Sequence, residues 1–220
     1  MQVRQLLDGV VPPLLVMGAS LLLIVIRQLY FKKGGRRALA DVALPMAIVG
    51  LAVWLEISMG RAPVYANGPV TLWHGDVNSD QNSQQVSDPY TFTHVIHGAA
   101  FFGMTRLTMG PATLALQAAV ALSLEAAWEA YENTDTVINR YRTATIALGY
   151  YGDSVLNSVA DMLACLLGFA LASRFRWWVT VSWVSATEIA LAIAIRDNLT
   201  LNIIMLLHPV EAIELWQLGS

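Results

Sequence analysis

The chain has 220 residues, of which 56% are hydrophobic and only 13% are charged, whereas soluble domains carry about 25% charged residues. The formal net charge of −3 argues against a nucleic-acid-binding protein. The single cysteine, Cys165, excludes an intramolecular disulfide and a thiolate metal cluster. The composition therefore predicts an all-α polytopic membrane protein, with residues 1–220 forming one integral-membrane domain.

Six stretches are long and apolar enough to cross the hydrocarbon core, which takes about 20 helical residues. They are residues 10–30, 39–59, 89–107, 111–131, 153–173 and 177–195. A last apolar stretch, 199–216, is short and contains His208 and Pro209. It is either a seventh span or a helix lying at the membrane surface, and we favour the second interpretation. The sequence thus predicts a bundle of about six transmembrane helices.

The basic residues predict the orientation of these spans. A cluster follows the first span, as after a stop-transfer segment rather than a cleavable signal peptide. By the positive-inside rule this side is cytoplasmic, and it holds eight of the thirteen Lys and Arg residues. These eight are Arg27, Lys32, Lys33, Arg36, Arg37, Arg106, Arg174 and Arg176. Both termini and two polar loops, at about 60–88 and 133–152, are then expected on the outer side.

The third span begins with two histidines. Asp88 followed by Pro89 is typical of a helix N-cap and first turn, which places the start of the helix. His94 and His97 are three residues apart and share one helical face. They either form hydrogen bonds near the membrane surface or serve together as metal ligands or bases.

The fourth span ends in a stripe of carboxylates. Glu125, Glu129 and Glu132 stand at i, i+4 and i+7, where like charges repel one another. The stripe predicts opposing cations, a bound metal ion or a protonated carboxyl group. A helix end emerging into water explains Glu132, but it explains Glu125 poorly because Glu125 lies about two turns deeper.

The fifth span carries a similar stripe. Asp153, Asn157 and Asp161 stand at i, i+4 and i+8. Asp153 is suited to be the N-cap of this helix. Asp161 lies about 12 Å inside the helix at about 1.5 Å per residue, close to the expected depth of Glu125.

Three arginines, Arg140, Arg142 and Arg196, lie in the outer loops near these stripes. They are candidate counter-charges, or clamps for a phosphate or carboxylate group. Arg196 and Asp197 could equally form a local surface pair. Because the three polar stripes agree in depth, the sequence predicts a polar cavity open to the outer face.

Three kinds of chemistry fit this cavity. His94 and His97, with carboxylates from Glu125, Glu129, Glu132 and Asp161, could hold one divalent metal ion, zinc, iron or manganese, that activates water. Glu125 or Asp161 could instead exchange protons with a histidine without a metal. The third alternative is no catalysis: the cavity binds a ligand, relays protons or docks the chain onto a larger membrane complex.

Several segments resemble a bacterial family of small inner-membrane proteins known as a domain of unknown function. They are the run from Asp88 to Gly98, the block from Glu125 to Asn133, the Arg140-Tyr141-Arg142 loop, the stretch from Gly152 to Asp161, the run from Arg196 to Asn202, and His208-Pro209. The resemblance covers nearly the whole chain. It implies a bacterial inner-membrane location, and it implies no activity.

A more distant resemblance is to VanZ-like membrane proteins, which are linked to glycopeptide-antibiotic resistance. The matching positions are Glu125 or Glu129, Arg140 or Arg142, Asp153 with Asn157, and Gly168. This resemblance implies cell-envelope or lipid chemistry.

The leading hypothesis is an inner-membrane enzyme, a hydrolase or transferase, acting at the periplasmic face on an anionic lipid or envelope intermediate. Its catalytic residues would be Glu125, Glu129, Asp161, Asp153 and Asn157, with Glu125, Glu129 and Asp161 as acid–base groups or ligands. His94, His97 and Glu132 would be metal ligands, and the three arginines would hold the anion. The alternative is a non-catalytic binding, proton-relay or assembly subunit.

Overall fold

The computed structural model describes residues 2–31, 35–145 and 149–219, and within these ranges every regular element is an α-helix. The fold class expected from the hydropathy is therefore confirmed. The helices are α1 (Gln2–Tyr30), α2 (Gly35–Ser58), α3 (Thr91–Met109), α4 (Leu114–Glu132), α5 (Asp135–Ala144), α6 (Val155–Arg174), α7 (Trp177–Ile195), α8 (Leu199–Leu207) and α9 (Glu211–Leu218).

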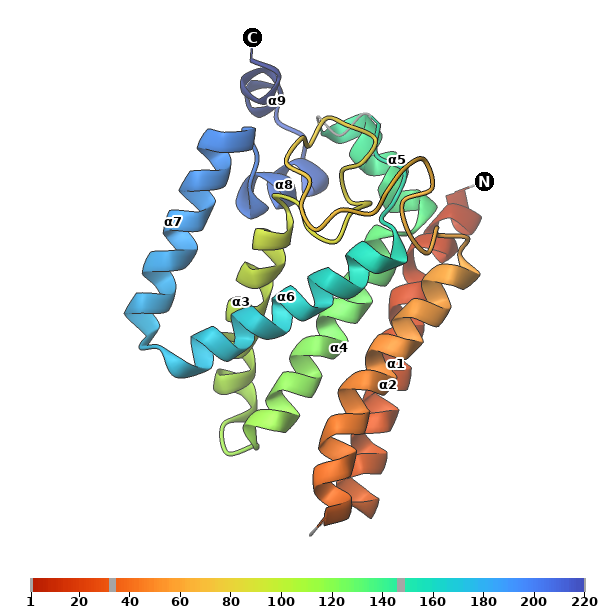
Figure 1. Ribbon diagram of the computed structural model, residues 1–220, viewed down its shortest axis with the longest axis vertical. Helices are drawn as coiled ribbons and strands as arrows, with labels where there is room; N and C mark the ends of the chain where they lie inside the picture. The colour runs from red at the N-terminus through yellow and green to blue at the C-terminus, as the bar shows by residue number, and fades with distance from the viewer. Residues whose placement is uncertain (1, 32–34, 146–148, 220) are drawn as a thin grey trace.

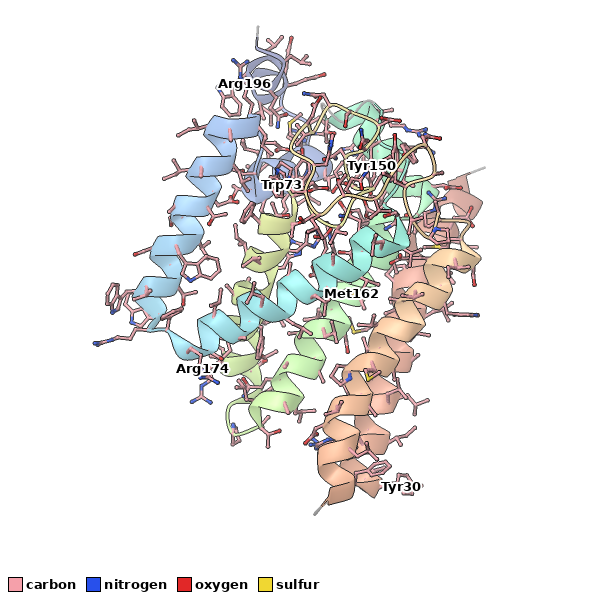
Figure 2. All side chains as sticks on the ribbon, viewed as in Figure 1. Tyr30, Trp73, Tyr150, Met162, Arg174 and Arg196 are labelled. Atoms are coloured by element: carbon pink, nitrogen blue, oxygen red, sulfur yellow. The ribbon has the colours of Figure 1, made fainter. Side chains whose placement is uncertain are left out.

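The longer helices run between the two ends of a bundle (Figure 1). Both termini lie at one end, together with residues 60–88, α5, α8 and α9. Tyr30 and Arg174 lie at the opposite end, whereas Trp73, Tyr150 and Arg196 lie near the termini (Figure 2). We call the end that holds both termini the loop end.

Within the part of the chain that the structure describes, four helices are long and apolar enough to cross a membrane. They are α1 from Leu7, α2 from Leu39, α6 and α7. Helices α3 and α4 have 19 residues each, as long as α7, but they are more polar because they carry the histidines and the glutamates. The two predicted spans that are less apolar are thus the ones that supply the histidines and glutamates of the candidate site.

The last apolar stretch differs from the prediction. Instead of one helix it forms α8 with nine residues and α9 with eight, separated at His208 and Pro209. At about 1.5 Å per residue neither helix is long enough by itself to cross roughly 30 Å of hydrocarbon, which favours the interpretation of helices at the membrane surface. Proline cannot donate a backbone hydrogen bond, which accounts for the interruption.

The outer loop expected at 133–152 contains a helix, α5, which the hydropathy pattern missed because this helix is polar. Thr134 caps it by accepting a hydrogen bond from the backbone N–H of Val137. Residues 146–148 of this loop, and Lys32 and Lys33 of the basic cluster, lie outside the described residues.

Helices α3 and α6 cross in very close contact at two glycines. A Cβ on Gly98 would overlap the carbonyl oxygen of Cys165 and lie 2.6 Å from the backbone nitrogen of Phe169. A Cβ on Gly168 would overlap the carbonyl oxygen of Val95. Glycine at these two positions thus allows the two helix backbones to come into direct contact. This contact sets the position of the histidines, since His94 and His97 flank it on α3.

The apolar core lies beside this crossing, between α1, α2, α4 and α6. Its central residues are Val16, Ile24, Leu44, Ile48, Ala52, Leu55, Ala119, Leu122, Ala126, Ala127, Ala130 and Met162. Small side chains on α4 allow α1 and α2 to approach it closely. At the far end, buried Arg27 forms an ion pair with Asp41 that joins α1 to α2.

Residues 60–88 are fixed to the start of α6. The backbone N–H groups of Ser154, Val155 and Leu156 donate to the carbonyl oxygens of Ser83, Ala62 and Pro63. The Ser154 hydroxyl accepts from the backbone N–H of Asn157, so Ser154 is the N-cap of α6, and the expectation that Asp153 caps it is wrong. The segment satisfies helix donors that would otherwise lack partners, and it covers the loop end of the bundle.

Candidate functional site

One carboxylate holds both histidines of α3. The Nδ1 atom of His94 lies 2.6 Å from Glu125 Oε1, and the Nδ1 atom of His97 lies 3.0 Å from Glu125 Oε2. The two imidazole rings stand edge to face with their centroids 5.1 Å apart. Glu125 is fully buried. Because each Nδ1 faces the carboxylate, the remaining ring nitrogen of each histidine is directed elsewhere.

Two further carboxylates converge on His94 from different helices. Glu129 Oε1, on α4, lies 3.2 Å from its Nδ1 atom, and Asp161 Oδ2, on α6, lies 3.8 Å from its Nε2 atom. The three polar stripes expected from the sequence therefore meet at one histidine. The equal depth predicted for Glu125 and Asp161 is confirmed by their common contact.

Three carboxylate oxygens near His94, on Glu129 and Asp161, lack hydrogen-bond partners. Neither oxygen of Glu129 forms a hydrogen bond, although Glu129 is fully buried, and Asp161 Oδ1 also has none. A buried polar group without a partner costs free energy, and a buried charge without one costs more. We therefore expect these oxygens to bind a cation or to be protonated.

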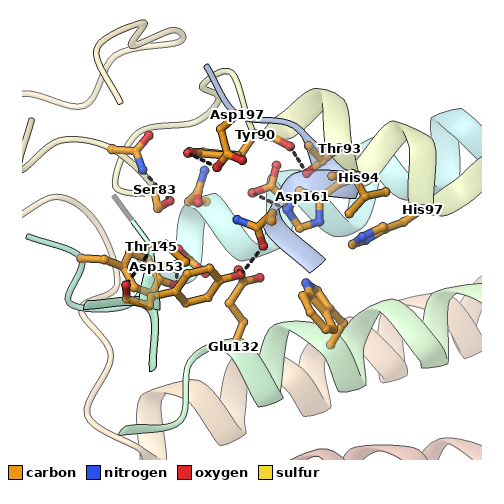
Figure 3. A pocket seen from close by; sticks show the side chains of 17 residues that line it. Ser83, Tyr90, Thr93, His94, His97, Glu132, Thr145, Asp153, Asp161 and Asp197 are labelled. Atoms are coloured by element: carbon orange, nitrogen blue, oxygen red, sulfur yellow. Dashed lines mark hydrogen bonds and ion pairs between the residues drawn. The ribbon is translucent and has the colours of Figure 1, made fainter. Parts of the chain in front are cut away.

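A small cavity of about 50 Å³ opens beside the histidines (Figure 3). His94, His97 and Asp161 line it, together with Glu132 and Asp153. Its volume has room for an ion or a few water molecules, since one water needs roughly 10–15 Å³ by this measure. Six of the predicted site residues belong to its lining: His94, His97, Glu132, Asp153, Asn157 and Asp161.

Glu125 and Glu129 are not among the residues that line the cavity. Glu125 lies behind the histidines, bonded to their Nδ1 atoms, while Asp161 lies on the cavity side at the Nε2 atom of His94. The site therefore has two layers: an inner carboxylate that orients the rings, and an outer set of donors that faces the cavity.

Two sets of side chains have donor atoms close enough to share one metal ion. His94, His97 and Glu125 form the first set, and His94, Glu129 and Glu132 form the second, each with donor atoms within 4.8 Å of one another. Nitrogen and carboxylate oxygen donors suit zinc, iron and manganese. His94 belongs to both sets and is the centre of the cluster.

Three tyrosines that sequence reasoning did not assign surround the cavity, each bonded to an acidic residue. Their hydroxyl groups donate as follows: Tyr90 to Asp197 Oδ2 at 3.0 Å, Tyr141 to Glu132 Oε1 at 2.5 Å, and Tyr150 to Asp153 Oδ1 at 3.0 Å. Tyr90 precedes His94 by one helical turn, and this spacing is the one sequence signal that could have indicated it.

Burial changes the proton affinity of the acids in the loops around the cavity. Burial raises the pKa of Asp153 well above its ordinary value, and the nearby charge of Glu132 raises it further. Burial also raises the pKa of Asp197, against the opposing effect of its hydrogen bond from Tyr90. Both acids thus bind a proton more tightly than they would in water.

Asn133, which was noted only as the end of the acidic block, organises the same region. Its side-chain oxygen accepts from the backbone N–H of Asp153 at 2.7 Å, and its amide nitrogen donates to Asp153 Oδ2 at 3.0 Å. The amide also donates to the carbonyl oxygen of Glu129 at 3.2 Å. Asn133 thereby fixes Asp153 at the end of α4.

The three predicted anion-binding arginines do not line the cavity. Arg140, Arg142 and Arg196 donate to the carbonyl oxygens of Leu206, Tyr150 and Trp216, respectively. Arg196 and Asp197 do not form the surface pair considered from the sequence, because Asp197 is buried and accepts from Tyr90 and Gln217. The role of these arginines as an anion clamp stays a prediction.

The fold and the cluster define a helical membrane protein with a buried histidine–carboxylate site at one end of its bundle. The family model described as "Protein of unknown function (DUF2585)" matches residues 56–219, and the chain belongs to this family. The matched range includes α3, α4 and α6, which carry the whole cluster, and leaves out α1 and most of α2.

The relatives come from bacteria. The chain is 51% identical to a UPF0314 protein of Sphingopyxis alaskensis over 79% of its own length and 93% of the relative. It is 47% identical to a UPF0314 protein of Rhizobium johnstonii, over 79% and 89%, and 46% identical to one of Paracoccus denitrificans, over 83% and 94%. No solved structure matches the chain.

Proposed function

We propose that this membrane protein is an enzyme, a hydrolase or transferase, whose histidine–carboxylate cluster holds one divalent metal ion. The observation that carries the proposal is the set of buried carboxylate oxygens on Glu129 and Asp161 that lack hydrogen-bond partners beside His94. A divalent cation at the Nε2 atom of His94 would satisfy Asp161 and the histidine together, and a proton would satisfy Glu129 on the Nδ1 side.

The arrangement of the ring nitrogens fits such an ion on the cavity side. Metal-binding histidines commonly donate their second ring N–H to a carboxylate, which fixes the tautomer and the ring orientation. Glu125 is placed to do this for both His94 and His97. Asp161 Oδ2 lies 3.8 Å from His94 Nε2, too far for a hydrogen bond. Two ligands of one ion, each about 2.0–2.2 Å from it, can have this separation. We therefore propose His94 and Asp161 as ligands on the cavity side and Glu125 as the residue that positions both histidine rings.

A bound divalent ion supplies a Lewis acid and lowers the pKa of a water molecule. The chain itself supplies the proton acceptors. Asp153 and Glu132 lie in the same lining, each bonded to a tyrosine hydroxyl, where they can accept and return protons. Residues 82–83 and the tyrosines belong to the same lining and would limit the entry of bulk water.

The charge and size of the cavity restrict the substrate. None of the 17 described lining residues is Lys or Arg, so an anionic group would be repelled unless a cation were bound first. A cavity of about 50 Å³ admits only the reacting group of a larger molecule. The substrate class that fits is an ester or phosphoester group on an anionic lipid or envelope intermediate.

We place the site at the periplasmic face of the bacterial inner membrane. Arg106, Arg174 and Arg176 lie at the helix ends opposite the site, as does Arg27. An excess of basic residues is typical of the cytoplasmic side, which puts the cavity and both termini outside.

A second candidate is a non-catalytic proton relay or binding subunit of a larger membrane complex. The observation that favours it is the ring of tyrosine–acid hydrogen bonds around the cavity, which could pass protons without any metal.

Elemental analysis by mass spectrometry of the detergent-purified protein, without chelators or an affinity tag, tests the proposal. We expect about one zinc, iron or manganese per chain. The double change His94→Ala and His97→Ala should remove it, whereas His208→Ala, at an exposed histidine outside the cluster, should leave it. Absence of metal, even after the purified protein is incubated with each of the three ions, would overturn the metal-dependent enzyme and favour the proton relay.

A further inference from the structure

A second cavity, of about 330 Å³, lies apart from the histidine cluster and shares none of its described lining residues. It is formed where the start of α1, the end of α2 and the junction of α4 with α5 come together at the loop end (Figure 1). Its volume is at the lower end of the range of small-molecule sites, about 300–1,000 Å³. It is therefore large enough for the polar head group of a lipid.

One wall of this cavity is apolar and continues onto the exposed face of α1. Leu7, Val11 and Pro12 supply this wall, and Met59 at the end of α2 completes it. One turn further along α1, Leu14 and Leu15 are exposed. This surface belongs to the helix segment that is long and apolar enough to cross a membrane. An acyl chain can follow it from the cavity towards the centre of the bilayer.

The other wall is charged and carries charges of both signs, from one arginine and two aspartates. The Arg61 guanidinium is held in place by the carbonyl oxygen of Tyr151 at 3.0 Å and by Asp135 Oδ1 at 3.2 Å. Its Nε atom is buried and has no hydrogen-bond partner. Asp8 and Asp135 line the same cavity and are exposed. One cation is thus combined with two carboxylates, which is the charge pattern that complements a zwitterion.

We propose that this second cavity binds a phospholipid whose zwitterionic head group carries a phosphate and a primary ammonium. The phosphate accepts from Arg61, the ammonium donates to Asp8 and Asp135, and an acyl chain lies along Leu14 and Leu15. Arg61 suits a phosphate because guanidinium binds oxyanions through several N–H groups. A purely anionic head group would meet the two carboxylates with no compensating cation of its own.

The proposal is independent of the metal site, and its test uses the full chain in lipid nanodiscs. The discs contain equal amounts of phosphatidylethanolamine, phosphatidylglycerol and phosphatidylcholine with the same acyl chains. Native mass spectrometry then measures which lipid stays bound to the released protein. We expect phosphatidylethanolamine to be retained about fivefold over each of the others, as one ion pair worth about 1 kcal/mol provides.

Two variants probe the two walls of the cavity separately. Asp8→Asn removes one partner of the ammonium and should lower the preference severalfold, whereas Glu214→Gln, at an exposed acid on α9, should not change it. Val11→Trp fills the apolar wall and should lower retention of every lipid. Leu22→Trp, at an exposed position further along α1, is its matched control.

Equal retention of the three lipids by the unchanged protein would overturn the proposal. So would a preference for phosphatidylethanolamine that survives both Asp8→Asn and Val11→Trp, because the lipid would then be bound elsewhere. The metal content of these variants is expected to equal that of the unchanged protein. Failure of the lipid site therefore remains distinguishable from failure of the metal site.

Discussion

Gly98 of α3 lies directly against the backbone of Cys165 of α6, with no room for a single additional carbon atom between them. Gly168 of α6 makes the reciprocal contact with Val95 of α3. The two glycines bring Asp161 to the histidine face of α3, since Asp161 lies just over one turn before Cys165 on the same helix. The geometry of the site therefore depends on this helix contact.

Gly98→Ala is expected to destabilise the protein strongly. The added methyl group must push α3 away from α6, and overpacking of this kind costs about 1–3 kcal/mol or more. For a chain of this size, each 1 kcal/mol lowers the melting temperature by roughly 2–4 °C. Thermal unfolding in detergent measures the loss. Gly103→Ala, on the same helix, has open space around its Cβ position and should be neutral or slightly stabilising; equal losses in both variants would contradict the structural explanation.

Glu125→Gln is expected to leave the fold intact and to weaken metal binding by about 10–100-fold. The amide has the size of the carboxylate, but it no longer provides two acceptor oxygens for the Nδ1–H groups of His94 and His97, and changes to such positioning residues typically have this effect. Metal titration followed by competition with a chelator measures the affinity. Glu211→Gln, at an exposed glutamate, is the control, and an unchanged affinity in Glu125→Gln would refute the positioning role.

Asn133→Ala should lower stability by about 1–3 kcal/mol, because it leaves the backbone N–H of Asp153 without its buried acceptor. Asn133→Asp tests the same contact differently. It keeps an oxygen for this N–H but places a second acid against Asp153, so we expect it to be less stable at pH 8 than at pH 5. Chemical unfolding at the two pH values provides the measurement.

Asp197 is expected to make stability depend on pH. Burial raises the pKa of Asp197 in the folded protein above that of the unfolded chain, which is about 3.9. Its contribution is then fully present below about pH 3.9 and is lost as the pH rises through the folded-state pKa. Between pH 4.5 and pH 8, the melting temperature of Asp197→Asn should therefore fall less than that of the unchanged protein. Parallel curves for the two proteins would show that Asp197 does not cause the dependence.

The orientation of the chain can be tested with single cysteines. Cys165 is buried, so it can be replaced by Ala to give a cysteine-free background. In that background Ser79→Cys, at the loop end, should react in intact cells with a thiol reagent that cannot cross the inner membrane. Thr108→Cys, at the opposite end of α3, should react only after the cells are opened. The reverse pattern would place the site in the cytoplasm.

Much of the site could be predicted from the sequence, because helical spacing fixes both the face and the depth of a residue. A rise of about 1.5 Å per residue is enough to place two groups of side chains at similar depth. These are the carboxylates at i, i+4 and i+7 on α4 and the histidines at i and i+3 on α3. Their meeting at His94 follows from this depth once the helices pack together. The spacing could not show that Glu125 lies behind the histidines, since that depends on the rotation of α4 about its axis.

The loops were predicted less well, because their polar residues satisfy one another locally. Gln84 and Gln85 look like exposed turn residues in the sequence, yet both are buried, and Gln84 donates to the carbonyl oxygen of Gly152. The arginines were expected to face the acids. In the structure they donate to backbone carbonyl oxygens of neighbouring segments. Because every residue has a carbonyl oxygen, the pattern of side chains in the sequence cannot predict such a partner. Helix α5 was missed because its polar sequence carries no membrane signal.

The attachment of residues 60–88 to α6 has a consequence for the order in which the protein assembles. The hydroxyl group of Ser154 donates a hydrogen bond to the carbonyl oxygen of Gln84, which lies 70 residues earlier in the chain. The side-chain amide of Asn157 donates to the carbonyl oxygen of Gln85, which lies 72 residues earlier. While the chain is being synthesised, this segment leaves the ribosome long before its partners exist. Its polar groups must remain hydrated until α3, α4 and α6 have been synthesised and packed together. Closure of the segment over the histidine cluster is thus a late event in biogenesis, and the finished site cannot form on a nascent chain that stops before α6.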